Sequence, residues 1–288
     1  MRLVEFMTDA GSRVGVTVGD GVCDLTARYP ELGGTVHELL QHPAWLSQIG
    51  TSFTADLDLQ SLRYRAVLGE TGRVFAAGLN YSKIYPAGKQ PPTPTRPPWF
   101  SKMPGTLVAH NEPVVAPEVS ETFDYEAELA AVIGTGGRHI TVDDALHHVA
   151  GWTCLNDGSV REWQRHSVSA GKNFERSGSI GPWVVTADEV DDPQDLRLIA
   201  RVDGQVRQDA NTSEMIFTVA EIISYLSQSI TLRPGDVVAT GSPEGTGGSF
   251  DPPRYLKAGQ LLEVEIEGIG VLVNPVISES QSRGTSSV

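Results

Sequence analysis

The sequence predicts an α+β protein made mostly of β-strands, with a barrel-like or sandwich-like antiparallel main domain and a few packed helices. Short runs of alternating apolar and polar residues recur from about residue 70, as in QLLEVEIEGIGVLVNPV (260–276). Asp203-Gly204 stands between two such runs, which is a strong hairpin signature. Few segments have helical spacing. The clearest is TVAEIISYLSQSI (218–230), where Thr218 and Glu221 are spaced as a capping box.

The chain divides into three parts by pattern. Residues 1–70 predict a small N-terminal α/β domain of two or three strands and a helix. Residues 71–277 form the predicted main domain, in which the proline-rich segment GKQPPTPTRPPWF (88–100) reads as an extended surface loop. The polar end SESQSRGTSSV (278–288) predicts a disordered tail.

Composition and charge exclude several classes of function. The 288 residues carry a formal net charge of -14, which disfavours nucleic acid and anionic membrane surfaces as partners. The start has no signal-peptide pattern, and no apolar run has the length needed to span a bilayer. Two cysteines, Cys23 and Cys154, are too few for a disulfide framework. We therefore expect a cytoplasmic protein with no nucleic-acid or membrane partner.

A crowded acidic strand raises the first functional hypothesis. In FDYEAELAAVIG (123–134), Asp124, Glu126 and Glu128 occupy alternate positions and so share one face of a strand. Like charges this close repel one another, so we expect positive groups beside them. Asp157 follows 29 residues after Glu128, at the end of another predicted strand.

The carboxylates Glu126, Glu128 and Asp157 form an all-oxygen set. Such ligands suit Mg²⁺, Mn²⁺ or Ca²⁺, whereas zinc would prefer the His and Cys that these segments lack. Arg161 follows shortly after Asp157. It is interpreted as a partner of a ligating carboxylate or of a substrate, with a structural salt bridge as the alternative.

The order of several motifs resembles the fumarylacetoacetate hydrolase family. The matching blocks cover about residues 71–275: GLNYSKIY, PWFSKM, FDYEAELAAVIG, AGWTCLNDGSVREWQ, GKNFERSGSIGPW, VDGQVRQDANTSEMIF and LRPGDVVATGSPEGTG. The resemblance implies a mixed β-sandwich roll, a usual homodimer, and an enzyme that acts on small 2-oxo or diketo acids. It also implies Mg²⁺ or Mn²⁺ bound by Glu126, Glu128 and Asp157.

Further site residues follow from the same blocks. The resemblance places the family's lysine at Lys172 and its glutamine at Gln164. The family's Gly-Thr-Pro turn beside the substrate is matched by Gly241, Ser242 and Pro243, with serine in place of threonine. We assign Tyr81 and Lys102, in two other matching blocks, to substrate binding as well.

The sequence departs from the family at the residues that activate water. Ile84 stands where members commonly carry a histidine, and Ala87 where an acidic residue often follows. Either Lys83, Tyr85 or His166 supplies the base, or the reaction needs no activated water. The first hypothesis is a metal-dependent hydrolase that cleaves a C–C bond in an acylpyruvate-type or fumarylacetoacetate-type diketo acid. A 2-oxo acid decarboxylase, tautomerase or isomerase is the second, and a catalytically silent metal-binding protein the third.

Overall fold

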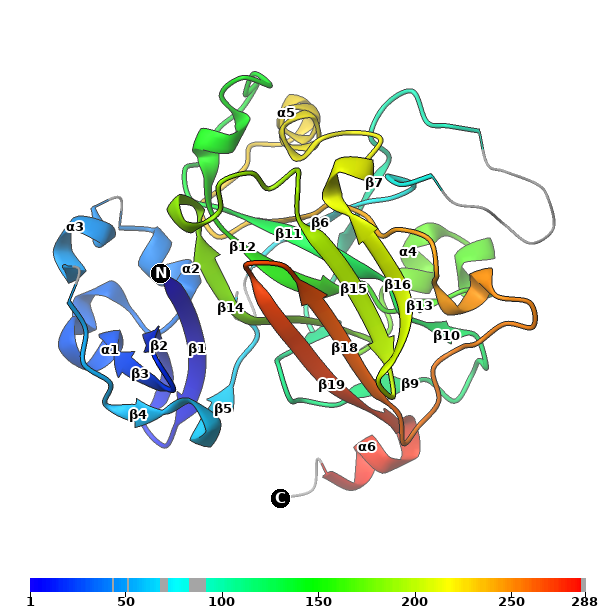
Figure 1. Ribbon diagram of the computed structural model, residues 1–288, viewed down its shortest axis with the longest axis horizontal. Helices are drawn as coiled ribbons and strands as arrows, with labels where there is room; N and C mark the ends of the chain where they lie inside the picture. Colours follow the sequence, from blue (N-terminus) through cyan, green and yellow to red (C-terminus); the bar gives the residue numbers. More distant parts are fainter. Residues whose placement is uncertain (43, 51, 68–71, 83–91, 286–288) are drawn as a thin grey trace.

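The computed structural model describes residues 1–42, 44–50, 52–67, 72–82 and 92–285 (Figure 1). Lys83, Ile84, Tyr85 and Ala87 lie outside these residues. Within them, strands predominate and the helices are few and short, so the predicted α+β class is confirmed. No helix in this part of the chain is long and apolar enough to cross a membrane.

Most strands belong to one twelve-stranded sheet within the described residues, in the order β4-β3-β2-β1-β14-β12-β11-β17-β6-β7, with β5 beside β1 and β8 beside β14. Its strands are β1 (Arg2–Thr8), β2 (Gly11–Val18), β3 (Gly21–Asp24), β4 (Leu57–Asp58), β5 (Arg63–Tyr64), β6 (Val74–Ala77), β7 (Trp99–Lys102), β8 (Leu107–Val108), β11 (Ala127–Ile133), β12 (Val149–Asn156), β14 (Gly178–Thr186) and β17 (Val237–Ala239).

A five-stranded sheet in the order β16-β15-β18-β19-β9 packs against the centre of the large sheet. It comprises β9 (Val114–Ala116), β15 (Arg197–Val202), β16 (Gln205–Asn211), β18 (Leu261–Ile266) and β19 (Gly270–Ser278). The short strands β10 (Phe123–Asp124) and β13 (Ser159–Val160) pair separately. Apolar side chains of both large sheets share one core, which includes Leu129, Trp152, Leu198 and Val264.

Short helices and turns cover the edges. The helices are α1 (Leu25–Arg28), α2 (Val36–Leu40), α3 (Trp45–Ile49), α4 (Val168–Lys172), α5 (Val219–Ser229) and α6 (Glu279–Thr285). The 3₁₀ turns are η1 (Pro30–Leu32), η2 (Leu59–Ser61), η4 (Ala145–His148), η5 (Trp163–Arg165), η6 (Ala187–Glu189), η7 (Thr212–Glu214) and η8 (Gly247–Ser249). Thr218 and Glu221 form the predicted capping box of α5.

The N-terminal strands and helices α1–α3 gather on one side of the molecule, at the left of Figure 1. They are joined to the rest through β1, where Leu3 pairs with Val184 of β14. The apolar core beneath them also contains residues of the main sheet, such as Leu155 and Val237. A boundary at residue 70 stays a prediction, because the sheet runs through both parts without interruption.

Other sequence predictions can be compared directly. Asp203 and Gly204 have φ angles of 52° and 72° and turn the chain from β15 into β16, as predicted. The proline-rich stretch is irregular over 92–98, whereas β7 begins at Trp99, and 88–91 lie outside the described residues. The expected disordered tail from residue 278 is wrong for 278–285. Ser278 ends β19 and is followed by α6, because its backbone N–H and hydroxyl both bond Gln281 Oε1.

Candidate functional site

Three carboxylates meet where β11 and β12 separate. Glu128 lies in β11, Glu126 precedes that strand, and Asp157 follows β12. The Asp157 N–H donates to the Glu126 carbonyl at 2.9 Å, which holds the two segments in register. Each of the three residues is buried, and one oxygen from each lies within 4.8 Å of the others. This spacing brings together the three carboxylates singled out in the sequence.

Two lysine ammonium groups lie among these carboxylates. Lys172 ends α4 and donates to Glu126 Oε2 and, at 2.6 Å, to Asp157 Oδ2. Lys102, on β7, donates to Asp157 Oδ1 at 2.8 Å and to the Lys172 carbonyl at 2.6 Å. Burial lowers the pKa of Lys172, but Asp157 and Glu126 together outweigh it, so the pKa is raised overall. Lys172 is therefore held as an ammonium ion.

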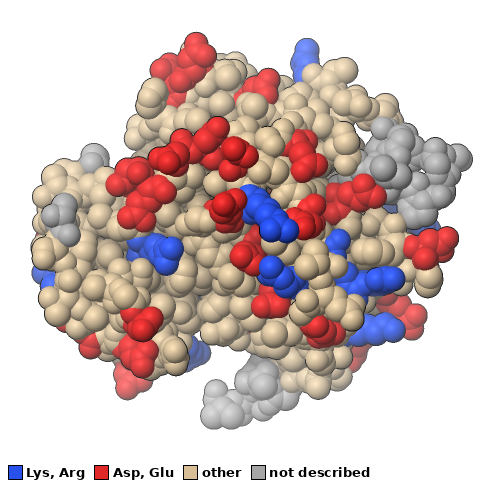
Figure 2. Space-filling view, in the orientation of Figure 1, with Lys and Arg blue, Asp and Glu red and all other residues tan. Residues whose placement is uncertain are grey.

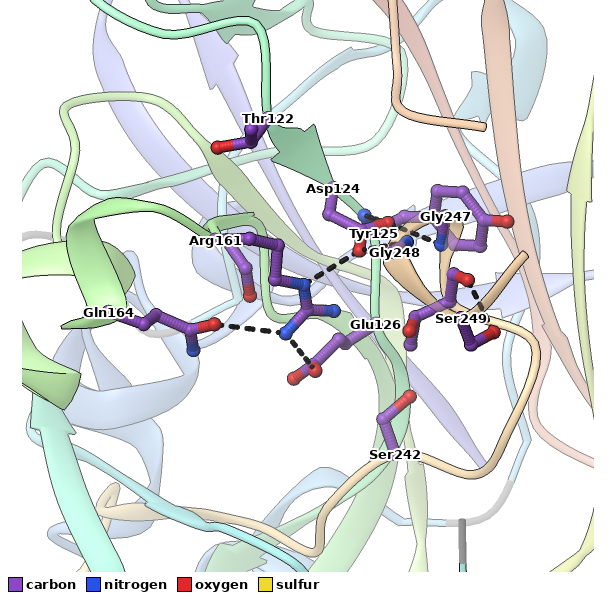
Figure 3. Close-up of polar contacts among 12 residues, drawn as sticks. Thr122, Asp124, Tyr125, Glu126, Arg161, Gln164, Ser242, Gly247, Gly248 and Ser249 are labelled. Carbon is purple, nitrogen blue, oxygen red and sulfur yellow. Dashed lines mark hydrogen bonds and ion pairs between the residues drawn. The ribbon is translucent and has the colours of Figure 1, made fainter. Parts of the chain in front are cut away.

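Arg161 links the fourth carboxylate, Asp124, to the same cluster (Figure 3). Its Nε donates to Asp124 Oδ2 at 2.7 Å, and its Nη1 donates to Glu126 Oε1 at 2.8 Å and to Gln164 Oε1 at 3.2 Å. The positive groups expected beside the acidic strand are thus Arg161 and Lys172. The guanidinium thus binds Oε1 of Glu126, while Oε2 accepts from Lys172.

A glycine-rich loop is fastened to Asp124 from its other side. Gly247 and Gly248 donate their backbone N–H groups to the Asp124 carboxylate at 2.6 and 2.9 Å. A Cβ on Gly247 would lie 2.7 Å from Asp124 Oδ1 and 2.5 Å from the Arg254 carbonyl, so this approach requires glycine. Asp124 therefore joins Arg161 to the loop.

The turn at 240–243 is held by Glu128 and by Gln208 of β16. Gly241, at a φ of 92°, donates its N–H to Glu128 Oε2 at 2.8 Å. Gln208 Nε2 donates to Ser242 Oγ and to the Pro243 carbonyl, both at 2.8 Å. Gln208 Oε1 also accepts the Ala127 N–H at 3.0 Å. One side chain thus connects the turn to the acidic strand.

The electrostatics of the cluster favour an added cation. Burial raises the pKa of Glu128 well above its usual range, and Asp157 and Glu126 raise it further while Lys172 lowers it. Among the described residues, the cluster holds the carboxylates of Asp124, Glu126, Glu128 and Asp157 and the cationic groups of Lys102, Arg161 and Lys172. Buried carboxylate oxygens at this spacing fit a hard divalent cation such as Mg²⁺, Mn²⁺ or Ca²⁺.

A cavity of about 390 Å³ opens onto this cluster. The Phe100 ring lies over the Lys172 ammonium, with Nζ 5.4 Å from the ring centroid. The lining combines charged and polar groups with an apolar wall: Ala77, Gly78, Leu79, Phe100, Glu126, Arg161, Gln164, Val168, Lys172, Ser242, Thr246, Gly248 and Tyr255. A small anionic ligand with a short apolar part suits these surroundings.

A family model described as "Fumarylacetoacetate (FAA) hydrolase C-terminal" matches residues 73–277. The chain belongs to the fumarylacetoacetate hydrolase family. It is also 37% identical over 289 residues to "Oxaloacetate tautomerase FAHD2A, mitochondrial" from Bos taurus, a match that covers 96% of this chain and 92% of the relative.

Solved structures of the family agree with the fold. Fumarylacetoacetate hydrolase from Exiguobacterium antarcticum is 32% identical with a TM-score of 0.80, covering 97% of this chain and 100% of that one. A 5-carboxymethyl-2-hydroxymuconate delta-isomerase from Mycobacterium smegmatis is 29% identical with a TM-score of 0.76, covering 97% and 99%. The family resemblance and the fold it implied are therefore confirmed.

The predicted site residues fall into two groups within this family fold. The structure brings together most of them around one cavity: Glu126, Glu128, Asp157, Arg161, Gln164, Lys172, Gly241, Ser242 and Pro243. His166 is different, because it is exposed and its ring lies 5.3 Å from that of Trp163, outside the cavity lining. Its predicted part in catalysis has no support from this placement.

Lys102 and Tyr81 lie behind the cavity lining, although both were assigned to substrate binding. The Lys102 side chain is fully buried and bonded to Asp157, so it positions that carboxylate and does not face a ligand. Tyr81 is buried, and its hydroxyl has no hydrogen-bond partner among the described residues. Burial raises the pKa of Tyr81, and Glu128 raises it further.

Sequence reasoning missed the roles of three residues. Asp124 shares the alternation of Glu126 and Glu128, and that pattern could have placed it in the site. Gln208 and Thr246 gave no comparable signal, because they come near the acidic strand only through the packing of β16 and of the loop at 240–249. Contacts between such distant segments cannot be deduced from spacing along the chain.

Proposed function

We propose that the protein is a divalent-metal-dependent enzyme that interconverts the enol and keto forms of a small 2-oxo acid of the oxaloacetate type. The observation that carries this proposal is the buried Lys172 ammonium between Glu126 and Asp157 at the wall of the cavity. The name of the bovine relative, an oxaloacetate tautomerase, supports the choice of reaction.

Each part of the cluster has a distinct task in this proposal. Glu126, Glu128 and Asp157 would hold Mg²⁺ or Mn²⁺, and the bound ion would supply a Lewis acid for the keto oxygen. Arg161 and Gln164 line the cavity, and they orient the carboxylate of the substrate through their N–H groups. Phe100 covers Lys172 and keeps bulk water from it.

Lys172 holds the proton that the reaction moves. Tautomerisation transfers one proton between the oxygen and the adjacent carbon of the substrate, and it consumes no water. Its Nζ lies at the cavity wall, hydrogen-bonded to Glu126 and Asp157, where it can give a proton to an enolate and recover one from the enol. The reaction balances without an activated water molecule, so it does not need the histidine that Ile84 replaces.

C–C bond hydrolysis of a diketo acid, the first hypothesis from the sequence, is the second candidate. It is favoured by the 32% identical structure named fumarylacetoacetate hydrolase. Hydrolysis requires a base for water, and none of the described lining residues is a histidine. Decarboxylation of a 2-oxo acid uses the same polarised keto group, and a silent metal-binding protein would show none of these activities.

One set of parallel assays separates these candidates. Enol–keto exchange of oxaloacetate, oxaloacetate decarboxylation and acetylpyruvate hydrolysis are measured with Mg²⁺, with Mn²⁺ and with a chelator. We expect exchange to be the fastest reaction and to stop with the chelator. Faster hydrolysis would select the second candidate, and metal binding without turnover would select the silent protein.

Assembly and location also stay proposals. We expect a homodimer that acts on a small molecule without a nucleic-acid or membrane partner. The cytoplasmic location expected from the sequence remains a prediction, since the bovine relative is named as mitochondrial.

A further inference from the structure

A second cavity lies outside the candidate site, beside the C-terminal helix α6 at the lower edge of Figure 1. Its volume is about 550 Å³, within the range of small-molecule sites. Three segments form it: the stretch from β9 onward, the segment around η5 and the end of α4, and α6. The lining residues are Val115, Pro117, Val119, Trp163, Phe174, Glu175, Arg176, Glu279, Ser282 and Arg283.

Aromatic and aliphatic side chains form the apolar part of this C-terminal cavity. Trp163 and Phe174 meet edge to face with ring centroids 5.2 Å apart. Val119, on the segment after β9, also lines the cavity and is 60% exposed. An exposed valine beside two aromatic rings offers a surface that a ring or short aliphatic group would cover.

Arg176 supplies a cation that pairs with no carboxylate of the described residues, although Glu175 lines the same cavity. Its backbone is fixed at a φ of 52° by hydrogen bonds to Gly105 and from Val115, both at 2.8 Å. Its guanidinium Nε is buried and has no acceptor within the described part of the chain. Arg283, the other arginine of the cavity, is bonded to Glu279 at 2.7 Å. Because Arg176 lines the cavity and its guanidinium has no partner among the described residues, an anion is the ligand that would complete it.

Helix α6, which forms one wall of the cavity, lies after the end of the region that the family model matches. The family model ends at residue 277, and α6 spans Glu279–Thr285. Glu279 fastens the helix by accepting the Glu118 N–H at 3.1 Å. The cavity shares no lining residue with the one at the candidate metal centre.

The opposite wall of the cavity is formed by residues close in sequence to those of the candidate metal centre. Trp163 directly precedes Gln164, and Phe174 comes two residues after Lys172. A ligand packed against both rings would restrain the two segments that carry Gln164 and Lys172. We propose that the C-terminal cavity binds a small carboxylic acid with an aromatic body, its carboxylate on Arg176 and its ring against Trp163 and Phe174.

Calorimetric titration of the full chain with phenylacetate tests this proposal. Saturating Mg²⁺ and oxalate are present throughout to occupy the candidate metal centre. We expect one phenylacetate per chain, with phenylacetamide and acetate each at least about tenfold weaker, because one lacks the charge and the other the ring. Binding is measured without turnover, so failure of this proposal and failure of the proposed function are distinguishable.

Substitutions at Arg176 and at Val119 change two different walls of the cavity. Arg176→Gln should weaken phenylacetate at least about tenfold, with affinity partly restored in Arg176→Lys. Val119→Trp, at an exposed position, should block the cavity without disturbing the core. Arg138→Gln, at an exposed arginine that donates to the Gln228 carbonyl at 3.0 Å, is the matched control and should bind normally.

The proposal is overturned by any of three results. One is the absence of binding at phenylacetate concentrations up to about 10 mM. Another is equal affinity for phenylacetate and phenylacetamide. The third is an affinity of Val119→Trp for phenylacetate equal to that of the wild type. This variant tests the cavity without any change at Arg176.

Discussion

The ammonium group of Lys172 shows how one side chain can serve two purposes at the residue scale. It neutralises Glu126 and Asp157, which would otherwise face each other buried, and it also borders the cavity. Lys102 resembles it in charge but is fully enclosed and contacts Asp157 and a carbonyl. The two lysines thus differ in position, because Lys102 is enclosed beside Asp157 whereas Lys172 borders the cavity.

Replacement of Lys172 by methionine should separate catalysis from metal binding. We expect turnover to fall by about 10²–10⁴, the usual effect of losing a proton-transfer group. Mn²⁺ should bind no more weakly than to the wild type, because the lost charge is positive. Steady-state rates and Mn²⁺ titrations measure both effects, with the exposed Lys257→Met as the control. Unchanged turnover in Lys172→Met would remove the lysine from the mechanism.

The carboxylates could be predicted from the sequence, whereas most of their partners could not. Alternate spacing places Glu126 and Glu128 on one face, and Asp157 ends a strand that proved to be the neighbour of β11. Lys102 bonds Asp157, which is 55 positions away in the chain. Gln208 bonds Ala127 of the acidic strand, which is 81 positions away. The pairing of β7 with β6, and the packing of the sheet that contains β16 against the large sheet, decide those contacts.

At the element scale, one carboxylate accepts two backbone N–H groups of the loop that carries η8. Asp124 receives the N–H groups of Gly247 and Gly248 as well as Arg161. Thr246 and Gly248 of this loop line the cavity. The geometry of that wall therefore follows the charge and the acceptor oxygens of Asp124.

Asp124→Asn should loosen this loop while leaving the metal ligands in place. We expect kcat/KM to fall by at least about tenfold, because small displacements of a positioning wall are expensive. The affinity for Mn²⁺ should stay near that of the wild type. Asp209→Asn removes a comparable but exposed carboxylate that pairs with Arg197, and it should have little effect on kcat/KM. Equal losses in both variants would contradict the assigned role.

Strand β1 contains a buried carboxylate that makes stability depend on pH. Glu5 accepts the Val36 N–H at 2.7 Å, and burial raises its pKa to about 8 despite that bond and the nearby Arg65. Between its usual pKa near 4.5 and about 8, the folded protein keeps a proton that the unfolded chain releases. The folded state therefore loses stability as the pH rises through this window.

Glu5→Gln should stabilise the protein most above pH 8, where ionised Glu5 is buried at full cost. The gain there should be on the order of a few kcal/mol, and it should shrink toward pH 5. Denaturant unfolding at both pH values measures the difference. Glu263→Gln, in the half-buried strand β18, is the control for the loss of one carboxyl group. A gain independent of pH would mean that Glu5 is not the group involved.

At the scale of the whole molecule, the strand content, the hairpin at 203–204 and the capped helix α5 were predictable from local pattern. The extent of the large sheet was not, because β1 joins β14 across about 180 residues and local spacing carries no information on that pairing. The prediction of a disordered tail was wrong for a related reason. The polar segment 279–285 is helical where Glu279 is fastened to Glu118, a contact that composition does not reveal.

The chain should form a homodimer. The resemblance set out from the sequence implies a homodimer, and a net charge of -14 does not prevent an apolar patch from closing a two-fold interface. Light scattering at micromolar protein should give twice the chain mass of 31.0 kDa. A mass equal to one chain would refute the prediction, and dilution across the transition would give the dissociation constant.

The central claim is that Glu126, Glu128 and Asp157 hold one divalent cation on which a 2-oxo acid is bound. Anomalous diffraction from crystals containing Mn²⁺ and oxalate tests it most directly. We predict one manganese peak at about 2.0–2.2 Å from an oxygen of each carboxylate, with oxalate beside Lys172, and its loss in Glu128→Gln crystals. Manganese elsewhere, a peak undiminished in Glu128→Gln, or oxalate bound away from Lys172 would contradict the account.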